Sequence, residues 1–461
     1  MSGFVWTRDR VRAALGLPEE GGPAKGYAGI STDTRTLEPG ELFVALPGAR
    51  FDGAEFVSAA IERGAAGAIA QRQLDDVPDG FDFFLVDDAI EALGRLAGER
   101  RREIDPTVVA ITGTSGKTTT RELTAGALGD GAYASPANFN NRVGLPLSIL
   151  RAPADAGIWI LELASNQPGE IAALGAVAEP DIAVITSVSE GHLEGLGDLQ
   201  GVLAEKLSLL RSLRDGGVAL VADEPPDLPR AAGEVWPDVR TVGLGPTADE
   251  RPERWSMSER GVAWRWHDVD FELHGFGSHL IRNALFACCV AHLLGIEPED
   301  AARRLGDVEL PPMRGEVRRL DGLTLLIDCY NANPASFRAA IDGLDALAAG
   351  RRRAVLAGTM LELGGRSETL HRQVARWMIE ADIELIAAIG EFREAFAKID
   401  RDGLILESDL ETAYRRLADE LSGDEAVLIK ASRGMKFERA VEMFQRDFGT
   451  DRGSSETRTR G

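Results

Sequence analysis

The sequence predicts an α/β protein of three domains, and three observations support that prediction. The chain has 461 residues, which is too long for one hydrophobic core and indicates about three domains. Its composition, 44% hydrophobic and 27% charged, is that of a globular protein. From about residue 104 onward, short apolar runs alternate with helical patterns, which is typical of a mostly parallel sheet with helices on both faces.

The alternation changes at two places, which we interpret as domain boundaries. The predicted units are a small N-terminal α/β domain (1–103), a central domain (104–311), a C-terminal α/β domain (312–449) and a disordered polar tail (450–461). In the first domain, strands are expected at 40–46, 66–70 and 83–86, and helices at 54–64 and 88–103. In the third, strands are expected at 323–328, 353–357, 385–389 and 426–430. Pro311-Pro312-Met313-Arg314-Gly315-Glu316 breaks the pattern as a linker would.

The strongest functional signal is a glycine-rich turn between a strand and a helix. Thr107–Ile111 is apolar and β-branched and predicts a buried strand, and 121–128 predicts a helix. Such a turn points backbone N–H groups at one spot, beside the positive end of the helix dipole. Lys117 would add a charge on the phosphates and Thr118 a hydroxyl for Mg²⁺. We predict an ATP site formed by Gly113, Thr114, Ser115, Gly116, Lys117, Thr118 and Thr119.

The match to the general phosphate-loop pattern is imperfect, because Ile111 stands where a first glycine is usual. The alternative is a tight strand-to-helix turn that happens to contain Gly-Lys-Thr. The strand before the turn and the helix after it favour the phosphate site.

Polar residues follow two further strands of the predicted central sheet. Glu162 comes at the end of the strand 158–161, and His192 comes just beyond the strand 181–186. Ligands bind at the carboxyl ends of strands in open α/β sheets, and Mg²⁺ is often held by one or two carboxylates plus phosphate oxygens. Glu162 is therefore a candidate Mg²⁺ ligand. His192 is a candidate functional residue, the alternative being a structural histidine.

Charge and cysteine content exclude some function classes. The formal net charge of −23 argues against nucleic acid or an anionic membrane as the main partner. No apolar run approaches ~20 residues and no signal peptide is recognisable, so we predict a cytoplasmic protein. Cys288, Cys289 and Cys329 lack metal-type spacing and fit reduced, buried residues.

Lysine is rare in this chain. Of 51 basic residues only six are lysine, so lysine is expected where arginine cannot replace it. This singles out Lys117, Lys206, Lys430 and Lys436, the alternative for each being chance survival on a solvated face. Lys206 lies in a predicted amphipathic helix, 201–214.

Two further segments have weaker signals. The loop Ser31-Thr32-Asp33-Thr34-Arg35 combines hydroxyls with an arginine, which suits a diphosphate or uridine, but it could equally be a capped turn. The segment 223–275 is rich in Pro, Trp and charge, and we predict a lobe of strands and loops there.

Several of these stretches together resemble the Mur ligase family, ATP-dependent enzymes that form amide bonds in peptidoglycan synthesis. The resemblance covers nearly the whole chain and rests on the phosphate loop 112–119, Asn138-Phe139-Asn140-Asn141, Glu162 with Pro168–Ile171, His192–Gly195, Tyr330–Pro334 and Met360–Gly364. The chain departs from the family pattern at Gln167, Thr359 and Ala431.

The resemblance implies a role for each matching residue. It places Ser31, Asp33, Arg35, Asn138 and Asn141 near a UDP-sugar, with the N-terminal domain binding UDP. It places Asn283 at the adenine, Arg314 at the phosphates, and Asp328 and Asn331 at the nucleotide from a Rossmann-like C-terminal domain. It implies two Mg²⁺ ions near Thr118, Glu162 and His192, and a carbamate formed from CO₂ on Lys206 as a further oxygen ligand. Lys117, Lys206, His192 and Glu162 would be the catalytic residues.

The implied activity is the joining of D-alanyl-D-alanine to UDP-N-acetylmuramoyl-tripeptide through an acyl phosphate. The segments 138–141 and 330–334 favour this activity over those of other members of the family. A monomer is expected, and the third residue of the tripeptide is not specified. The alternatives are a folylpolyglutamate- or cyanophycin-type ligase, or a phosphate-loop regulatory module without ligase activity.

Overall fold

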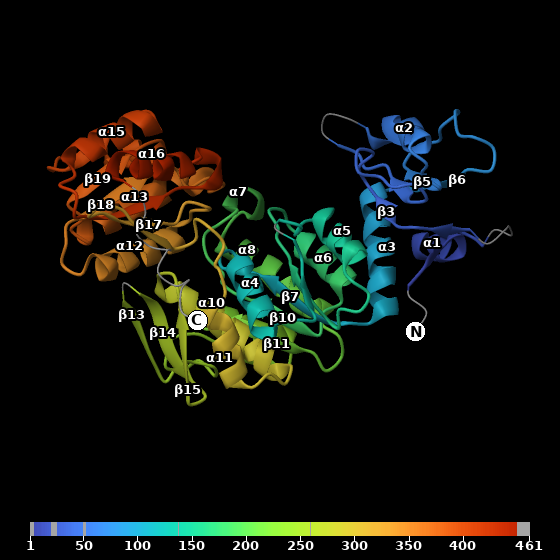
Figure 1. The fold of residues 1–461 in the computed structure, drawn as a ribbon, viewed down its shortest axis with the longest axis horizontal. Helices are drawn as coiled ribbons and strands as arrows, with labels where there is room; N and C mark the ends of the chain where they lie inside the picture. Colours follow the sequence, from blue (N-terminus) through green and yellow to red (C-terminus); the bar gives the residue numbers. More distant parts are fainter. Residues whose placement is uncertain (1–3, 20–24, 49–51, 137, 259, 450–461) are drawn as a thin grey trace, which may run out of the picture.

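The computed structural model describes residues 4–19, 25–48, 52–136, 138–258 and 260–449. Three sheets of four to six strands follow one another along the chain and form three units in a row (Figure 1). The three-part α/β prediction is confirmed, whereas the boundaries at 103 and 311 stay predictions. The predicted tail, 450–461, lies outside the described residues. Within these ranges, no helix combines the length and apolarity needed to cross a membrane.

The N-terminal unit is a small parallel sheet with helices. Its strands are β1 (Trp6–Thr7), β2 (Gly26–Tyr27), β3 (Ile30–Ser31), β4 (Leu42–Val44), β5 (Gly67–Ala70) and β6 (Asp82–Leu85), and its helices are α1 (Arg8–Leu15), η1 (Gly53–Phe56), α2 (Val57–Glu62) and α3 (Ala89–Ile104). β3-β4-β5-β6 run parallel in that order, and β1 pairs antiparallel with β2. Asp88 caps α3 by accepting from the N–H groups of Ile90 and Glu91. This long helix joins the unit to the next (Figure 1).

The central unit is a six-stranded parallel sheet of order β12-β11-β10-β7-β9-β8. Its strands are β7 (Thr107–Thr112), β8 (Ala132–Ala134), β9 (Ile158–Glu162), β10 (Ile182–Ile185), β11 (Val218–Ala222) and β12 (Val239–Val242). Its helices are α4 (Lys117–Leu128), α5 (Gly144–Arg151), α6 (Glu170–Ala178), α7 (Leu193–Leu196), α8 (Leu199–Leu207), η2 (Ser208–Ser212), α9 (Asp227–Val235), α10 (Ser278–Leu293) and α11 (Pro298–Gly306).

This strand order determines where the site forms. From β7 the chain first builds β8 and β9 on one side and then β10 to β12 on the other. The loops after β7 and β10 therefore leave the sheet in opposite directions and open a crevice at its carboxyl edge. β7 and β10 are almost fully buried apolar strands, as expected for a sheet covered on both faces.

The segment 223–275 differs from the prediction. It contains the helix α9 and the strand β12 of the main sheet, besides an antiparallel sheet of β13 (Arg254–Ser258), β14 (Gly261–Trp266) and β15 (Val269–Leu273). The helix was missed because Pro225, Pro226 and Pro229 favour a loop. Pro229 lies in the first turn of α9, where a missing N–H breaks no intrahelical hydrogen bond.

The C-terminal unit is a six-stranded sheet of order β16-β17-β21-β18-β19-β20, in which only β16 is antiparallel to its neighbour. Its strands are β16 (Glu316–Arg319), β17 (Thr324–Ile327), β18 (Arg353–Ala357), β19 (Leu385–Ala388), β20 (Leu404–Leu406) and β21 (Ala426–Lys430). Its helices are α12 (Pro334–Ala348), η3 (Gly364–Arg366), α13 (Ser367–Glu380), α14 (Glu391–Phe396), α15 (Leu410–Glu420), η4 (Arg433–Met435) and α16 (Glu438–Phe448). The four predicted strands are confirmed; the edge strands β16 and β20 were not predicted.

Candidate active site

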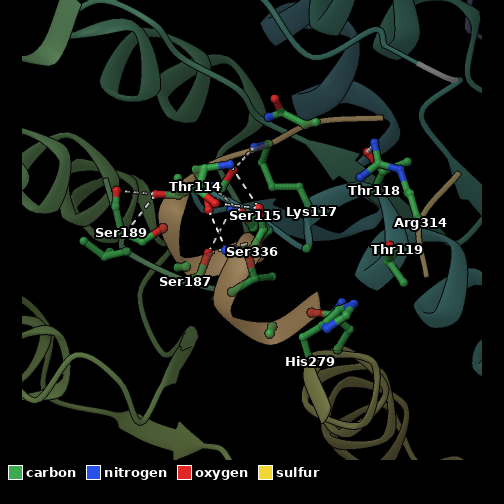
Figure 2. Close-up of a pocket in the computed structure, with 18 of the residues that line it drawn as sticks. Thr114, Ser115, Lys117, Thr118, Thr119, Ser187, Ser189, His279, Arg314 and Ser336 are labelled. Carbon is green, nitrogen blue, oxygen red and sulfur yellow. Dashed lines mark hydrogen bonds between the residues drawn. The ribbon is translucent and has the colours of Figure 1, made fainter. Parts of the chain in front are cut away.

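A cavity of about 670 Å³ lies between the central and C-terminal units. Its central wall is the crevice after β7, β9 and β10, and its opposite wall comes from the linker after α11, the loop after β17 and the start of α12. Figure 2 shows the phosphate-loop residues beside Ser187, Ser189 and Ser336, with Arg314 next to Thr118. The cavity thus depends on segments from both units of one chain.

The glycine-rich loop approaches its neighbours too closely for side chains at two positions. Gly116 has φ +87°, and a Cβ there would lie 2.5 Å from Asn283 Oδ1. Gly113 has φ +149°, and a Cβ there would lie 2.1 Å from Thr186 Oγ1. Glycine therefore lets this loop take a left-handed turn while packed against α10 and the end of β10.

Lys117 begins α4 and curls back over the loop. Its Nζ donates to Gly113 O at 2.7 Å and to Thr114 O at 3.3 Å. Burial lowers the pKa of Lys117, and the nearby Glu162 carboxylate partly opposes that shift. A desolvated ammonium at the floor of the crevice is well placed to attract a polyphosphate.

Ser115 links the two units. Its N–H donates to Ser187 Oγ at 2.8 Å, and its Oγ accepts from Asn333 Nδ2 at 2.9 Å. Asn333 also caps α12, since its Oδ1 accepts from Ser336 N at 2.8 Å. The phosphate loop is therefore hydrogen-bonded to the first turn of a C-terminal helix.

Glu162 is buried at the carboxyl end of β9, and both of its carboxylate oxygens have partners. Oε2 lies 3.2 Å from Arg121 Nη1, and Oε1 accepts from Asn140 Nδ2 at 2.8 Å. These contacts compensate for the burial of the carboxylate at the cavity wall, because a buried charge is stable only when paired or hydrogen-bonded.

His192 lines the cavity from the loop between β10 and α7. Its Nδ1 lies 2.5 Å from Oε2 of Glu362, which belongs to the C-terminal unit. The His192 imidazole beside it lowers the pKa of Glu362 below its usual range. The histidine is thus paired with a carboxylate from the C-terminal unit.

Lys206 lies behind the cavity wall, on α8, and does not line the cavity. Its side chain is fully buried, and Nζ donates to Ser165 Oγ at 2.8 Å. Burial lowers the pKa of Lys206 to about 7, and the charge of Lys117 adds to the effect. A large share of this amine is therefore neutral near pH 7.

The C-terminal side of the cavity carries a second set of charges. The Arg314 guanidinium lies 3.9 Å from the centre of the Tyr330 ring, and its Nη2 donates to Thr118 Oγ1 at 3.2 Å. Burial lowers the pKa of Arg314. Behind it, the buried Lys430 is paired with Asp328.

Three family models match consecutive parts of the chain. They are described as "Mur ligase family, catalytic domain" (residues 26–101), "Mur ligase middle domain" (111–291) and "Mur ligase, glutamate ligase domain" (313–433). A Bacillus subtilis protein named UDP-N-acetylmuramoyl-tripeptide--D-alanyl-D-alanine ligase is 33% identical over 424 residues, which is 90% of this chain and 92% of the relative. The chain belongs to the Mur ligase family.

Solved Mur ligase structures share the whole fold. A crystal structure of MurF from Acinetobacter baumannii aligns with a TM-score of 0.85 at 26% identity and covers 97% of this chain and all of that one. MurF from Thermotoga maritima in complex with ADP aligns with a TM-score of 0.82 at 29% identity, covering 91% and 97%. The chain is accordingly an ATP-dependent amide ligase of this family.

The cavity brings together most of the predicted site residues of this Mur ligase. Those that line it are Thr114, Ser115, Gly116, Lys117, Thr118, Thr119, Asn138, Glu162, His192, Asn283, Arg314, Asp328 and Asn331. Gly113 belongs to the same loop but does not line the cavity, and its carbonyl accepts from Lys117 Nζ. Asn141 does not line the cavity; its Oδ1 accepts from Val143 N and Gly144 N at 3.1 and 2.8 Å, a local structural role.

The predicted UDP-sugar residues of the N-terminal unit lie apart from this cavity. Ser31 is the last residue of β3, and its Oγ bonds to the backbone at Asp33. Asp33 and Arg35 form a bidentate pair, whose hydrogen bonds lower the pKa of Asp33 to about 2. The arginine side chain is exposed, so its guanidinium is accessible.

Some residues of the site had no predicted role. Glu362 and Asn333 lie in segments that carried the family resemblance, and Ser187 and Ser189 follow β10, where a hydroxyl-rich turn is itself a signal. His279 and Arg282 extend the cavity along α10. These residues come together only because the central and C-terminal units pack against each other, and no local sequence pattern predicts that packing.

Proposed function

We propose that this Mur ligase joins D-alanyl-D-alanine to the terminal carboxylate of UDP-N-acetylmuramoyl-tripeptide, forming the pentapeptide, ADP and phosphate. The observation that carries the proposal is the 33% identity over 90% of the chain with a relative named for this reaction. The cavity supports it, because a phosphate loop, a buried carboxylate and a histidine face one space.

The chemistry explains why ATP is required. A carboxylate does not accept an amine at neutral pH, so its oxygen must first attack the γ-phosphorus of ATP to give an acyl phosphate and ADP. Lys117 and Arg314 would neutralise the charge on the transferred phosphoryl group. The amine of the dipeptide then attacks the acyl carbon, and phosphate leaves from the tetrahedral intermediate.

The residue roles are part of the proposal. Gly113 to Thr119 would cradle the phosphates, Asn283 would face adenine, and Asp328 and Asn331 would hold the ribose side of ATP. Ser31, Asp33, Arg35 and Asn138 would bind the UDP-sugar, with Asn141 shaping that loop. Because the two halves of the cavity meet across Ser115 and Asn333, seating of the C-terminal unit would exclude water from the acyl phosphate.

The polar side chains that line the cavity suit Mg²⁺ if phosphate oxygens of the nucleotide supply the remaining ligands. Among the residues that the structure describes, no group of three or more His, Cys, Asp or Glu side chains could hold a metal by itself. Thr118, Glu162 and His192 all line the cavity, and Mg²⁺ needs only one or two protein carboxylates beside substrate phosphates. Two ions bound there would neutralise charge and align the phosphoryl group.

Lys206 would supply a further oxygen ligand as a carbamate. Its pKa of about 7 leaves a neutral amine that can add CO₂, forming an N–C bond and releasing a proton. Arginine could not react in this way, which fits the retention of lysine here. We expect Lys206→Ala to be nearly inactive and partly rescued by short carboxylic acids; full activity without added acid would remove the carbamate.

A phosphate-release assay separates the proposal from its nearest rival. With UDP-N-acetylmuramoyl-tripeptide and ATP present, D-alanyl-D-alanine should stimulate phosphate release and glutamate should not. Stimulation by glutamate alone would favour a folylpolyglutamate-type ligase. We also propose a cytoplasmic monomer, since ATP is available there and both walls of the cavity come from one chain.

A further inference from the structure

One loop of the C-terminal unit, residues 358–366, reaches across to the central unit. Besides the contact of its side chain with His192, Glu362 accepts through its backbone carbonyl from Glu194 N at 3.2 Å. At Gly364 an added Cβ would lie 3.1 Å from Glu194 Cα, so the two backbones nearly touch. The loop is therefore docked on α7, immediately after His192, by backbone and side chain together.

The backbone at this contact is unusual on both sides. Glu362 has φ +64° and His192 has φ +56°, left-handed conformations that non-glycine residues adopt rarely. The Glu362 loop is held from behind, because Met360 N donates to the buried His371 Nε2 and Leu361 N donates to Ser432 Oγ, each at 2.9 Å. Strained residues that their surroundings fix in place are typical of functional sites.

We propose that Glu362 is a positioning residue that orients the His192 imidazole for the metal. Metal-binding histidines characteristically donate their second ring N–H to a carboxylate, which fixes the tautomer and the ring orientation. A proton on Nδ1 facing Glu362 leaves the Nε2 lone pair for the ion. Since Glu362 belongs to the C-terminal unit, the metal site is complete only when that unit is seated. This inference rests on the proposed role of His192.

The alternative is a surface ion pair that merely holds the two units together. The Glu362 side chain is 54% exposed, and exposed ion pairs contribute little to stability. A pair that only joined the units would be lost in either single variant, so each would weaken closure over the nucleotide and, with it, ADP binding in the absence of metal. A residue that orients His192 for the ion weakens metal binding and leaves metal-free ADP binding unchanged, and the double-mutant cycle tests whether its effect passes through His192.

The experiment measures binding of Mn²⁺, a paramagnetic substitute for Mg²⁺, to the full chain with saturating ADP, using the electron paramagnetic resonance signal of free Mn²⁺. We expect Glu362→Ala to weaken binding about 10- to 100-fold and Glu362→Gln, which keeps an acceptor oxygen, to weaken it less. Adding Glu362→Ala to His192→Ala should cause no further loss. Glu368→Gln, an exposed carboxylate on α13, is the matched charge control.

The possible failures are distinguishable. If His192→Ala binds Mn²⁺ as the wild type does, the proposed metal role of His192 fails, and this inference fails with it. If His192→Ala weakens binding but Glu362→Ala does not, only the positioning role is overturned. Additive losses in the double variant would also overturn it, because Glu362 would then act independently of His192. A matching loss of metal-free ADP affinity in Glu362→Ala would overturn it as well, in favour of a general effect on closure.

Discussion

Replacing Lys206 by methionine is predicted to stabilise the protein while abolishing the proposed ligation. The side chain is fully buried, and its pKa of about 7 lies far below the ordinary lysine value of 10.5. Keeping this group in place at pH 7 costs about 4 kcal/mol relative to a solvated lysine. Methionine has a similar length and no charge but loses the hydrogen bond to Ser165, about 1 kcal/mol. The net gain is therefore about 3 kcal/mol.

The stability that Lys206→Met gains over the wild type should shrink as the pH rises. Between pH 7 and 10.5 the unfolded wild-type chain binds a proton at this lysine that the folded chain does not, so wild-type stability rises with pH through that window. The methionine variant lacks this contribution. The difference between the two proteins is thus largest at or below pH 7 and falls by about 1.4 kcal/mol per pH unit well above it.

Urea unfolding in CO₂-depleted buffer at pH 7 and pH 9 provides the measurement. Depletion matters because a carbamate would stabilise the wild type alone. We expect a higher urea midpoint for Lys206→Met at pH 7, a smaller difference at pH 9, and no ligation at either pH. A variant less stable than the wild type at pH 7 would refute the reasoning, because burial would then not be opposing the charged form.

Three further predictions follow from the cavity. Lys117→Ala should abolish ATP turnover, measured as ADP release; turnover at the wild-type rate would contradict the phosphate site. Gly116→Ala should bind ADP at least about tenfold more weakly in calorimetry, since its Cβ would lie 2.5 Å from Asn283 Oδ1 at φ +87°. Unchanged affinity would mean that the loop adapts. Arg314→Ala should lower kcat more than it raises the KM for ATP, because a charge on the transferring phosphoryl group acts mainly in the transition state. The reverse pattern would assign Arg314 to binding alone.

Local sequence was enough to locate the phosphate loop and the strand ends beside it. The β-branched strand, the glycines and Lys117 are consecutive, and the strand-turn-helix geometry follows from them directly. Glu162 and His192 could be assigned because parallel strands bring their carboxyl ends to one edge of the sheet. These predictions needed the order of elements but no knowledge of side-chain packing.

Contacts between the units could not be predicted in this way. The pairing of His192 with Glu362 joins the second and third sheets, and no periodicity encodes how two sheets face each other. The burial of Lys206 likewise depends on the packing of α8 against its neighbours. The polar strand β16 was not predicted, because an edge strand has one neighbour and tolerates charge.

The most direct test of the account is the mass of the product. After incubation with ATP, UDP-N-acetylmuramoyl-tripeptide and D-alanyl-D-alanine, mass spectrometry should show the nucleotide-linked pentapeptide, with one ADP and one phosphate formed per molecule. An unchanged tripeptide mass while ATP is consumed, or a product enlarged by another amino acid, would contradict the account.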